Sequence, residues 1–168
     1  MPNQPILRYP HPVLKKICNR VETIDTTIQS LVEDLLDTMH AGPGSVGVAA
    51  PQIGVTLRVC VVDVSASRHG KDNHHGQLCM INPEIVARDG AAIMREGCMS
   101  VPDYTGDVER ATAITVRFSE LDGNPREIEA SGFEAVAIQH EMDHLDGILF
   151  LDRIVSIKTG LFRRKSYA

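Results

Sequence analysis

The sequence predicts an α+β domain in which antiparallel or mixed β-sheets pack around a central helix. One segment has the apolar spacing of a helix, a second reads as a helix that is apolar on nearly all sides, and several short runs rich in β-branched residues read as strands. Because helices and strands do not alternate regularly along the chain, segregated helices and sheets are indicated.

The first helix is expected over Thr26–Ala41. Its apolar residues recur at three- and four-residue steps and so share one face: Ile28, Leu31, Val32, Leu35, Leu36 and Met39. The sequence Gly42-Pro43-Gly44 follows directly and ends the helix. The segment therefore reads as an amphipathic helix with one buried side.

Strands are expected at residues 57–64, 78–86 and 113–118, which are short, apolar and rich in β-branched side chains. The polar residues 65–77 lie between the first two strands and include three histidines: His69, His74 and His75. Metal ligands on a solvated loop would have to be ordered at an entropic cost. A surface loop is therefore favoured over a metal site in this segment.

A second helix is expected over residues 133–145, and Asp146-Gly147 ends it. Its residues are apolar on nearly all sides before His140. A helix of that kind is buried in the interior of a protein. It is therefore predicted to lie in the middle of the molecule, surrounded by the sheets.

Length and charge exclude several classes of protein. The chain has 168 residues, 17 of them Lys or Arg and 22 Asp or Glu, so its formal charge is −5 and its size is that of one domain. A general DNA-binding surface is not expected, and no apolar run approaches the roughly 20 residues that span a membrane. The first residues lack the pattern of a secretory signal, so a cytoplasmic location is expected.

The four cysteines are expected to be reduced. Cys60 and Cys79 lie inside apolar runs that read as strands, which favours buried thiols over two disulfides formed with Cys18 and Cys98. Cys98 differs from the others because Gly97 and Ser100 beside it suggest a tight turn with exposed backbone.

The second helix contains a His-Glu-x-x-His pattern at His140, Glu141 and His144. Residues four apart lie one above the other on a helix, so both imidazoles can reach one metal ion. Glu141 then stands beside the ion and can take a proton from water. The alternative is a pair of helix-face histidines beside a carboxylate, which the buried context makes costly.

A catalytic metal site of this kind needs a third protein ligand. Asp146 and Asp152 are the only later acidic residues, and Asp146 is expected to cap the helix end or to orient a ligand histidine. Cys98 is the better candidate because its thiolate is a strong ligand, although a lone cysteine is usually an inert core residue.

Small residues are dense in segment 44–54, in which Gln52 is the long polar side chain. Such residues allow another molecule to approach the backbone closely. The alternative is a glycine-rich linker between the first helix and the first strand. Phosphate binding is not expected, because a Lys-Ser or Lys-Thr pair and a directly following helix are both missing.

These three segments together resemble the peptide deformylase family. That family carries a Gly-x-Gly-Leu-Ala-Ala-x-Gln loop, a Glu-Gly-Cys-Leu-Ser turn and a Gln-His-Glu-x-Asp-His helix, in this order. The counterparts here are residues 45–52, 96–100 and 139–144. Flanking pieces also match, so the resemblance covers most of the chain: residues 6–10, 51–54, 82–83, 101–102 and 146–150.

The resemblance implies a hydrolase that removes the formyl group from the N-terminal formyl-methionine of newly made bacterial or organellar proteins. It implies one divalent metal held by Cys98, His140 and His144, with water in the fourth position. Fe²⁺ is expected in the cell, and Zn²⁺, Ni²⁺ or Co²⁺ can replace it. The metal would make hydroxide available near neutral pH to attack the formyl carbon.

The remaining catalytic positions of the family fall on four residues. Glu141 corresponds to the general acid and base, and the side-chain amide of Gln52 and the backbone N–H of Met99 correspond to oxyanion donors. Gly47 belongs to the same catalytic loop. Negative charge gathers on the former carbonyl oxygen during the reaction, and each fixed donor there is worth roughly 3 to 4 kcal/mol.

The pocket for the methionine side chain is expected along one face of the second helix. Three residues precede His140 by seven, four and three positions and stack on its side: Phe133, Val136 and Ala137. The resemblance implies the same, with further residues from other segments around the substrate: Val46, Gly47, Met94 and Gly97. The alternative is that the three helix residues are ordinary core.

The chain departs from the family pattern at a few positions. Ser45 replaces a glycine, and Val48 and Met99 replace leucines. Thr105 stands where some members have an arginine that meets the substrate backbone, so peptide contacts are expected to differ there. Two alternative functions are less favoured. A non-catalytic ribosome-associated module is one, but Glu141 and the metal ligands are all kept here. A different metal hydrolase is the other, and it would need a wider cavity than a deformylase.

Residues 153–168 are expected to form a basic tail behind a single catalytic domain of residues 1–152. The tail contains no acidic residue, so it carries +5 and the remainder −10: Arg153, Lys158, Arg163, Arg164 and Lys165. This asymmetry favours contact of the tail with a polyanion, and the resemblance implies the ribosome. Gly160 interrupts any helix there, and a solvated end is the alternative.

Overall fold

The computed structural model describes residues 5–164 and confirms the α+β class. One antiparallel sheet contains, in spatial order, β1 (Gly47–Ala49), β2 (Val59–Val62), β3 (Leu78–Asp89), β6 (Ala113–Ser119) and β7 (Pro125–Ser131). A second contains β4 (Ala92–Cys98), β5 (Val101–Arg110) and β8 (Leu161–Arg163). The α-helices are α1 (Thr26–Ala41), α2 (Gly132–Leu145) and the short α3 (Ile157–Gly160). Among the described residues, none of these helices is long and apolar enough to cross a membrane.

The two long helices pack on opposite faces of β2. Cys60 and Val62 belong to the core cluster that includes α2, whereas Val59 and Val61 belong to the cluster around α1. Successive side chains of a strand point to opposite faces, so a strand covered on both sides must be apolar throughout. All four residues of β2 are accordingly buried.

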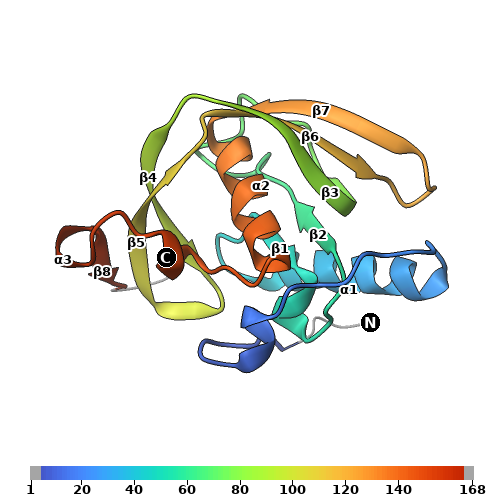
Figure 1. The fold of residues 1–168 in the computed structure, drawn as a ribbon, viewed down its shortest axis with the longest axis horizontal. Helices are drawn as coiled ribbons and strands as arrows, with labels where there is room; N and C mark the ends of the chain where they lie inside the picture. Colours follow the sequence, from blue (N-terminus) through green and yellow to red (C-terminus); the bar gives the residue numbers. More distant parts are fainter. Residues whose placement is uncertain (1–4, 165–168) are drawn as a thin grey trace.

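The helix α2 lies at the centre of the molecule, between the two sheets (Figure 1). Every residue from Ala137 to Leu145 is buried, including the two histidines of the His-Glu-x-x-His pattern. Its apolar residues pack against the five-stranded sheet, and Ile138 and Leu145 are fully enclosed. The chain therefore surrounds a helix that also carries ionisable groups, and those groups need partners inside the protein.

The strands β4, β5, β7 and β8 lie outside the three strands expected from the sequence. The residues of β4 and β7 alternate between exposed and buried over much of their length, and their exposed positions carry charged side chains such as Arg95 and Glu129. One face of such a strand meets solvent, so its sequence lacks the continuous apolar run of β2. The small-residue segment 44–54 likewise contains β1 and a 3₁₀ turn, Ala50–Ile53.

Residues 153–164 of the basic segment contribute the edge strand of the three-stranded sheet, β8. After a 3₁₀ turn, Phe150–Arg153, the chain forms α3 and then β8, whose Phe162 pairs with Thr105 of β5. Figure 1 shows α3 and β8 beside β5. Lys165 lies outside the described residues.

All four cysteines lie in the described part of the chain and are free. Cys18, Cys60 and Cys98 are buried, and Cys79 is partly buried. Burial raises the pKa of the Cys18 thiol to about 11 and that of Cys60 well above its ordinary value. These two thiols are therefore core residues in their neutral form.

Candidate active site

Three side chains with strong affinity for metals converge between β4 and α2. Cys98 is the last residue of β4, and His140 and His144 lie one turn apart on α2. One ligand atom from each lies within 4.8 Å of the others, and Cys98 Sγ is 3.3 Å from His144 Nε2. A thiolate with two imidazoles is a donor set suited to a divalent transition metal such as zinc or iron. These residues therefore fit the metal that the sequence motifs imply.

Glu141 lies beside this group with its carboxyl group inside the protein. The residue is 4% exposed, and its Oε1 is buried without a hydrogen-bond partner among the described residues. Burial raises the pKa of Glu141 to about 7. A carboxyl group in this state can both accept and release a proton near neutral pH.

Gly47 gives the Glu141 carboxyl group its space. A Cβ atom at position 47 would lie 2.7 Å from Glu141 Oε2 and 2.8 Å from its Cγ, which is closer than packed atoms approach. A side chain at this position of β1 would therefore displace the carboxyl group. The close approach of Glu141 therefore requires a glycine at this position.

The side chain of Gln52 is fixed within the same region. Its Oε1 accepts a hydrogen bond of 3.0 Å from the backbone N–H of Ala49. Its Nε2 donates to Ser100 Oγ at 3.1 Å and lies 3.4 Å from Cys98 Sγ. The amide NH₂ is thereby turned toward the metal ligands, where a developing negative charge can be met by a donor.

A cavity of about 300 Å³ opens beside these groups. All residues expected to bind the substrate line it: Val46, Gly47, Met94, Gly97, Phe133, Val136 and Ala137. Gln52, Cys98, Met99, His140 and Glu141 line the same cavity. The loop at 65–77 also reaches it, since His69 lines the cavity and its ring lies 5.5 Å from that of Phe133.

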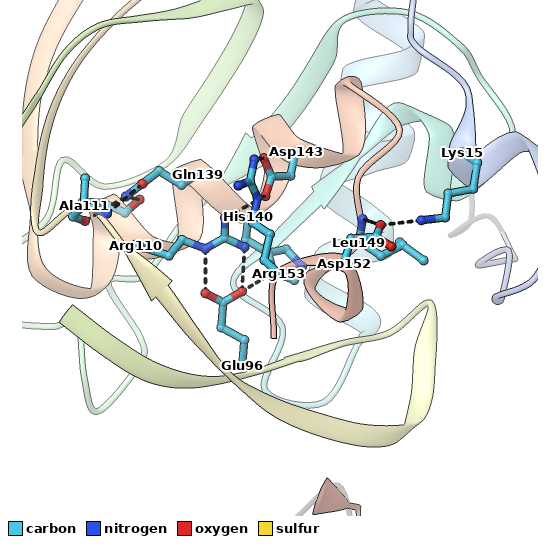
Figure 2. A network of polar contacts seen from close by, with 11 residues as sticks. Lys15, Glu96, Arg110, Ala111, Gln139, His140, Asp143, Leu149, Asp152 and Arg153 are labelled. Carbon is cyan, nitrogen blue, oxygen red and sulfur yellow. Dashed lines mark hydrogen bonds and ion pairs between the residues drawn. The ribbon is translucent and has the colours of Figure 1, made fainter. Parts of the chain in front are cut away.

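Behind His140, a network of ion pairs joins the three-stranded sheet to α2 (Figure 2). His140 Nδ1 lies 2.9 Å from Glu96 Oε1, and the Glu96 carboxylate accepts two hydrogen bonds from Arg110, of 2.7 and 2.9 Å. Arg110 also donates to Asp143 at 2.7 Å. Asp143 in turn accepts from Arg153 at 2.6 and 3.0 Å.

This network sets the ionisation of Glu96. Burial alone would raise its pKa, but hydrogen bonds from Arg110 and His140 outweigh burial and lower the pKa to about 2. The carboxylate therefore stays charged and holds Nδ1 of His140, which leaves Nε2 to face the other ligands. A carboxylate that orients a ligand histidine in this way fixes its tautomer and its ring.

The partners of His140 were not found by sequence reasoning. Glu96, Arg110 and Asp143 come from β4, β5 and α2, and no spacing rule pairs them. One signal was present, because Asp143 is an acidic residue on a helix expected to be buried and so requires a cationic partner. Of the two roles expected for Asp146, the structure shows the first. Asp146 is the C-cap residue of α2, and its side chain pairs with Arg58 at 2.9 Å.

The fold and the site together define a metal-dependent hydrolase with one cysteine and two histidine ligands beside a buried glutamate. The polypeptide deformylase family model matches residues 3–160. A peptide deformylase of Bartonella tribocorum is 42% identical over 166 residues, which cover 98% of this chain and 92% of the relative.

Solved structures give the same result. A peptide deformylase from Legionella pneumophila matches with a TM-score of 0.84 and 40% identity, covering 93% of this chain and 88% of that one. A peptide deformylase from Ehrlichia chaffeensis in complex with actinonin matches with a TM-score of 0.87 and 36% identity, covering 94% and 92%. The chain belongs to the peptide deformylase family. It is a metal-dependent hydrolase that removes an N-terminal formyl group.

Proposed function

We propose that the cavity beside Cys98, His140 and His144 deformylates the N-terminal formyl-methionine of nascent polypeptides, with Glu141 as general acid and base. The observation that carries this proposal is the carboxyl group of Glu141, which is buried, has no hydrogen-bond partner at Oε1 within residues 5–164, and lines the same cavity as Cys98 and His140. A proton-transfer group in such a place serves hydrolysis of an unactivated amide.

The chain's own residues divide the chemical work. A divalent metal bound by Cys98, His140 and His144 supplies Lewis-acid chemistry, which activates water and polarises the formyl carbonyl. Glu141 takes a proton from the attacking water and later gives it to the leaving amine. Gln52 Nε2 and the backbone N–H of Met99 donate to the oxygen on which negative charge develops.

The methionine side chain is proposed to enter the apolar part of the cavity. Phe133, Val136 and Ala137 present one face of α2 there, and the other segments close it through a second group: Val46, Gly47, Met94 and Gly97. An unbranched thioether side chain fits such an irregular apolar space. The reacting formyl group then lies near Glu141, at the other side of the same cavity.

Fe²⁺ is the native metal in this proposal, with Zn²⁺, Ni²⁺ or Co²⁺ able to replace it. Imidazole and thiolate ligands accept all of these ions, so metal supply in the cell decides occupancy. Elemental analysis of protein purified without oxygen is expected to find iron. Zinc as the main metal under those conditions would contradict the assignment.

We further propose that the enzyme works in the bacterial cytoplasm and that its C-terminal basic segment contacts the ribosome. Lys158 is exposed, whereas Arg153 is engaged by Asp143. Contacts with phosphates weaken as salt rises. Lys158→Glu lies outside β8 and is expected to reduce co-sedimentation with ribosomes at low salt. Equal sedimentation of variant and native protein would refute this contact.

Release of formate tests the central proposal. The metal-loaded enzyme is expected to release formate from formyl-Met-Ala and to leave acetyl-Met-Ala and unformylated Met-Ala intact. The acetyl peptide is the matched control, because it differs only by one methyl group at the reacting carbonyl. Equal hydrolysis of the acetyl peptide, or no formate from the formyl peptide, would overturn the proposed function.

A further inference from the structure

A cationic side chain from the C-terminal segment reaches the catalytic cavity. Arg164 follows β8 directly and lines the cavity together with Cys98, His140 and Glu141. Its guanidinium group lies against Gly97, where an added Cβ atom would collide with Nη2 and lie 3.3 Å from Cζ. Gly97 immediately precedes Cys98, so this positive charge stands one residue away from a metal ligand.

The sheet determines the position of Arg164. The backbone N–H of Arg164 donates to the carbonyl oxygen of Asp103 at 2.8 Å, which continues the pairing of β8 with β5. Phe162 and Arg164 are two residues apart and share one face of the strand. Phe162 packs under Arg95 of β4, whose Cζ is 3.6 Å from the ring centroid. Arg164 takes the corresponding place over Gly97, two residues further along β4.

The peptide that follows formyl-methionine has so far been assigned no hydrogen-bond donor in the cavity. In the function proposed above, on which this inference rests, the formyl group lies near Glu141 and the methionine side chain lies against α2. The peptide residues that follow methionine must pass the rim of the cavity, and each brings a carbonyl oxygen that requires a donor. A guanidinium group offers five N–H donors in a planar arrangement suited to carbonyl and carboxylate oxygens.

We propose that Arg164 is a substrate-binding residue that donates hydrogen bonds to oxygen atoms of the peptide beyond formyl-methionine. Gly97 makes this placement feasible, because any side chain there would occupy the space of the guanidinium group. Backbone oxygens are common to all peptides, so the contact strengthens binding with little dependence on the peptide sequence. The C-terminal segment thus contributes directly to the catalytic cavity.

The test compares Arg164→Ala with Arg163→Ala on substrates of different length. Arg163 is the matched control, because it is the adjacent arginine, is exposed, and lies on the opposite face of β8. The substrates are formyl-Met amide, formyl-Met-Ala-Ser and formyl-Met-Ala-Ser amide. For Arg164→Ala, kcat/KM for both tripeptides is expected to fall about 10- to 100-fold relative to formyl-Met amide, chiefly through KM.

The two tripeptides distinguish whether Arg164 donates to a backbone carbonyl oxygen or to the terminal carboxylate of the peptide. A loss on both supports a backbone carbonyl as the acceptor, and a loss on the free acid alone supports the terminal carboxylate. Arg163→Ala is expected to keep native kinetics on every substrate. Arg164→Lys keeps the charge and is expected to recover part of the lost kcat/KM. Arg164→Gln keeps part of the aliphatic stem without the charge and is expected to recover none of it.

A purely structural role of Arg164 predicts a different pattern. It would lower the melting temperature and reduce turnover of all three substrates by the same factor, and that result would overturn the proposal. Unchanged kinetics in Arg164→Ala and Arg164→Gln would overturn it as well. Calorimetric binding of the product Met-Ala-Ser, expected to weaken in Arg164→Ala, gives a readout independent of turnover. If the native enzyme released no formate from formyl-Met amide, the proposed function itself would fail.

Discussion

Glu96 Oε1 lies 2.9 Å from His140 Nδ1, so a carboxylate on β4 holds a metal ligand on α2. The same carboxylate is bound by Arg110, which also donates to Asp143, three residues after His140 on the same helix (Figure 2). The orientation of His140 therefore depends on both the three-stranded sheet and the central helix. Mutations in this network are expected to act on the metal site without touching the substrate.

Glu96→Gln is expected to change how stability depends on pH. Because the pKa of Glu96 falls from its ordinary 4.5 to about 2 on folding, the native protein gains stability from this group above pH 4.5. That gain, on the order of 3 kcal/mol, is lost as the pH falls toward 2. The free energy of unfolding in urea, measured for both proteins after chelation of the metal, is expected to be lower for Glu96→Gln at pH 7. This difference in free energy is expected to narrow below pH 4. A difference that stays constant with pH would contradict the assignment.

Glu141→Gln is expected to bind metal normally and to lose about 10² to 10⁴ in kcat. The change is isosteric, so the ligand geometry survives while the proton-transfer group does not. The measurements are formate release and metal content of the same preparation. Turnover near the native value in a fully loaded variant would remove Glu141 from its proposed role.

Oxidation of Cys98 is expected to inactivate the iron form of the enzyme. The cavity opens next to this cysteine, and a thiolate beside a redox-active ion is prone to oxidation. Iron-loaded enzyme is therefore expected to lose activity in air, while zinc-loaded enzyme keeps it. Mass spectrometry should find added oxygen on the peptide that contains Cys98. Equal survival of both metal forms in air would refute this explanation.

Ala137→Leu is expected to fill the methionine pocket. Ala137 is 5% exposed and lines the cavity one turn of α2 before His140 and Glu141. The larger side chain should raise KM for formyl-Met-Ala, with a smaller effect on formyl-Ala-Ala, whose first side chain is short. Metal content and melting temperature serve as controls. If the ratio of the two KM values stayed unchanged in a stable, metal-loaded variant, the methionine side chain would not bind beside Ala137.

The helices could be predicted from the sequence because the apolar residues of α1 repeat with the helical period, and because α2 is a long run, apolar on nearly all sides, that Asp146-Gly147 ends. The range Thr26–Ala41 agrees with α1, and the range 133–145 differs from α2 only by Gly132 at its start. The strand β2 was visible because it is covered on both faces. By contrast, β4 and β5 form a pair with polar exposed positions, and their pairing is a property of the sheet that no local pattern encodes.

The candidate site was predictable to the extent that its residues lie in short motifs. Cys98, His140, Glu141 and Gln52 belong to segments whose composition is unusual for ordinary core. Arg110 and Arg164 carry no such signal, because an arginine in a strand or near the end of a chain is normally solvated. Their roles depend on distances between segments remote in the sequence, and these become visible only in the folded structure.

The ligand side chains come from two separate parts of the fold, Cys98 from the three-stranded sheet and the two histidines from the central helix. In an unfolded chain Cys98 is far from the two histidines, so a metal ion binds the native state much more tightly. Each tenfold rise in free metal above its dissociation constant then adds about 1.4 kcal/mol to the free energy of unfolding. The metal thus acts as a reversible cross-link, and resistance to heat and proteolysis should follow the metal supply of the cell.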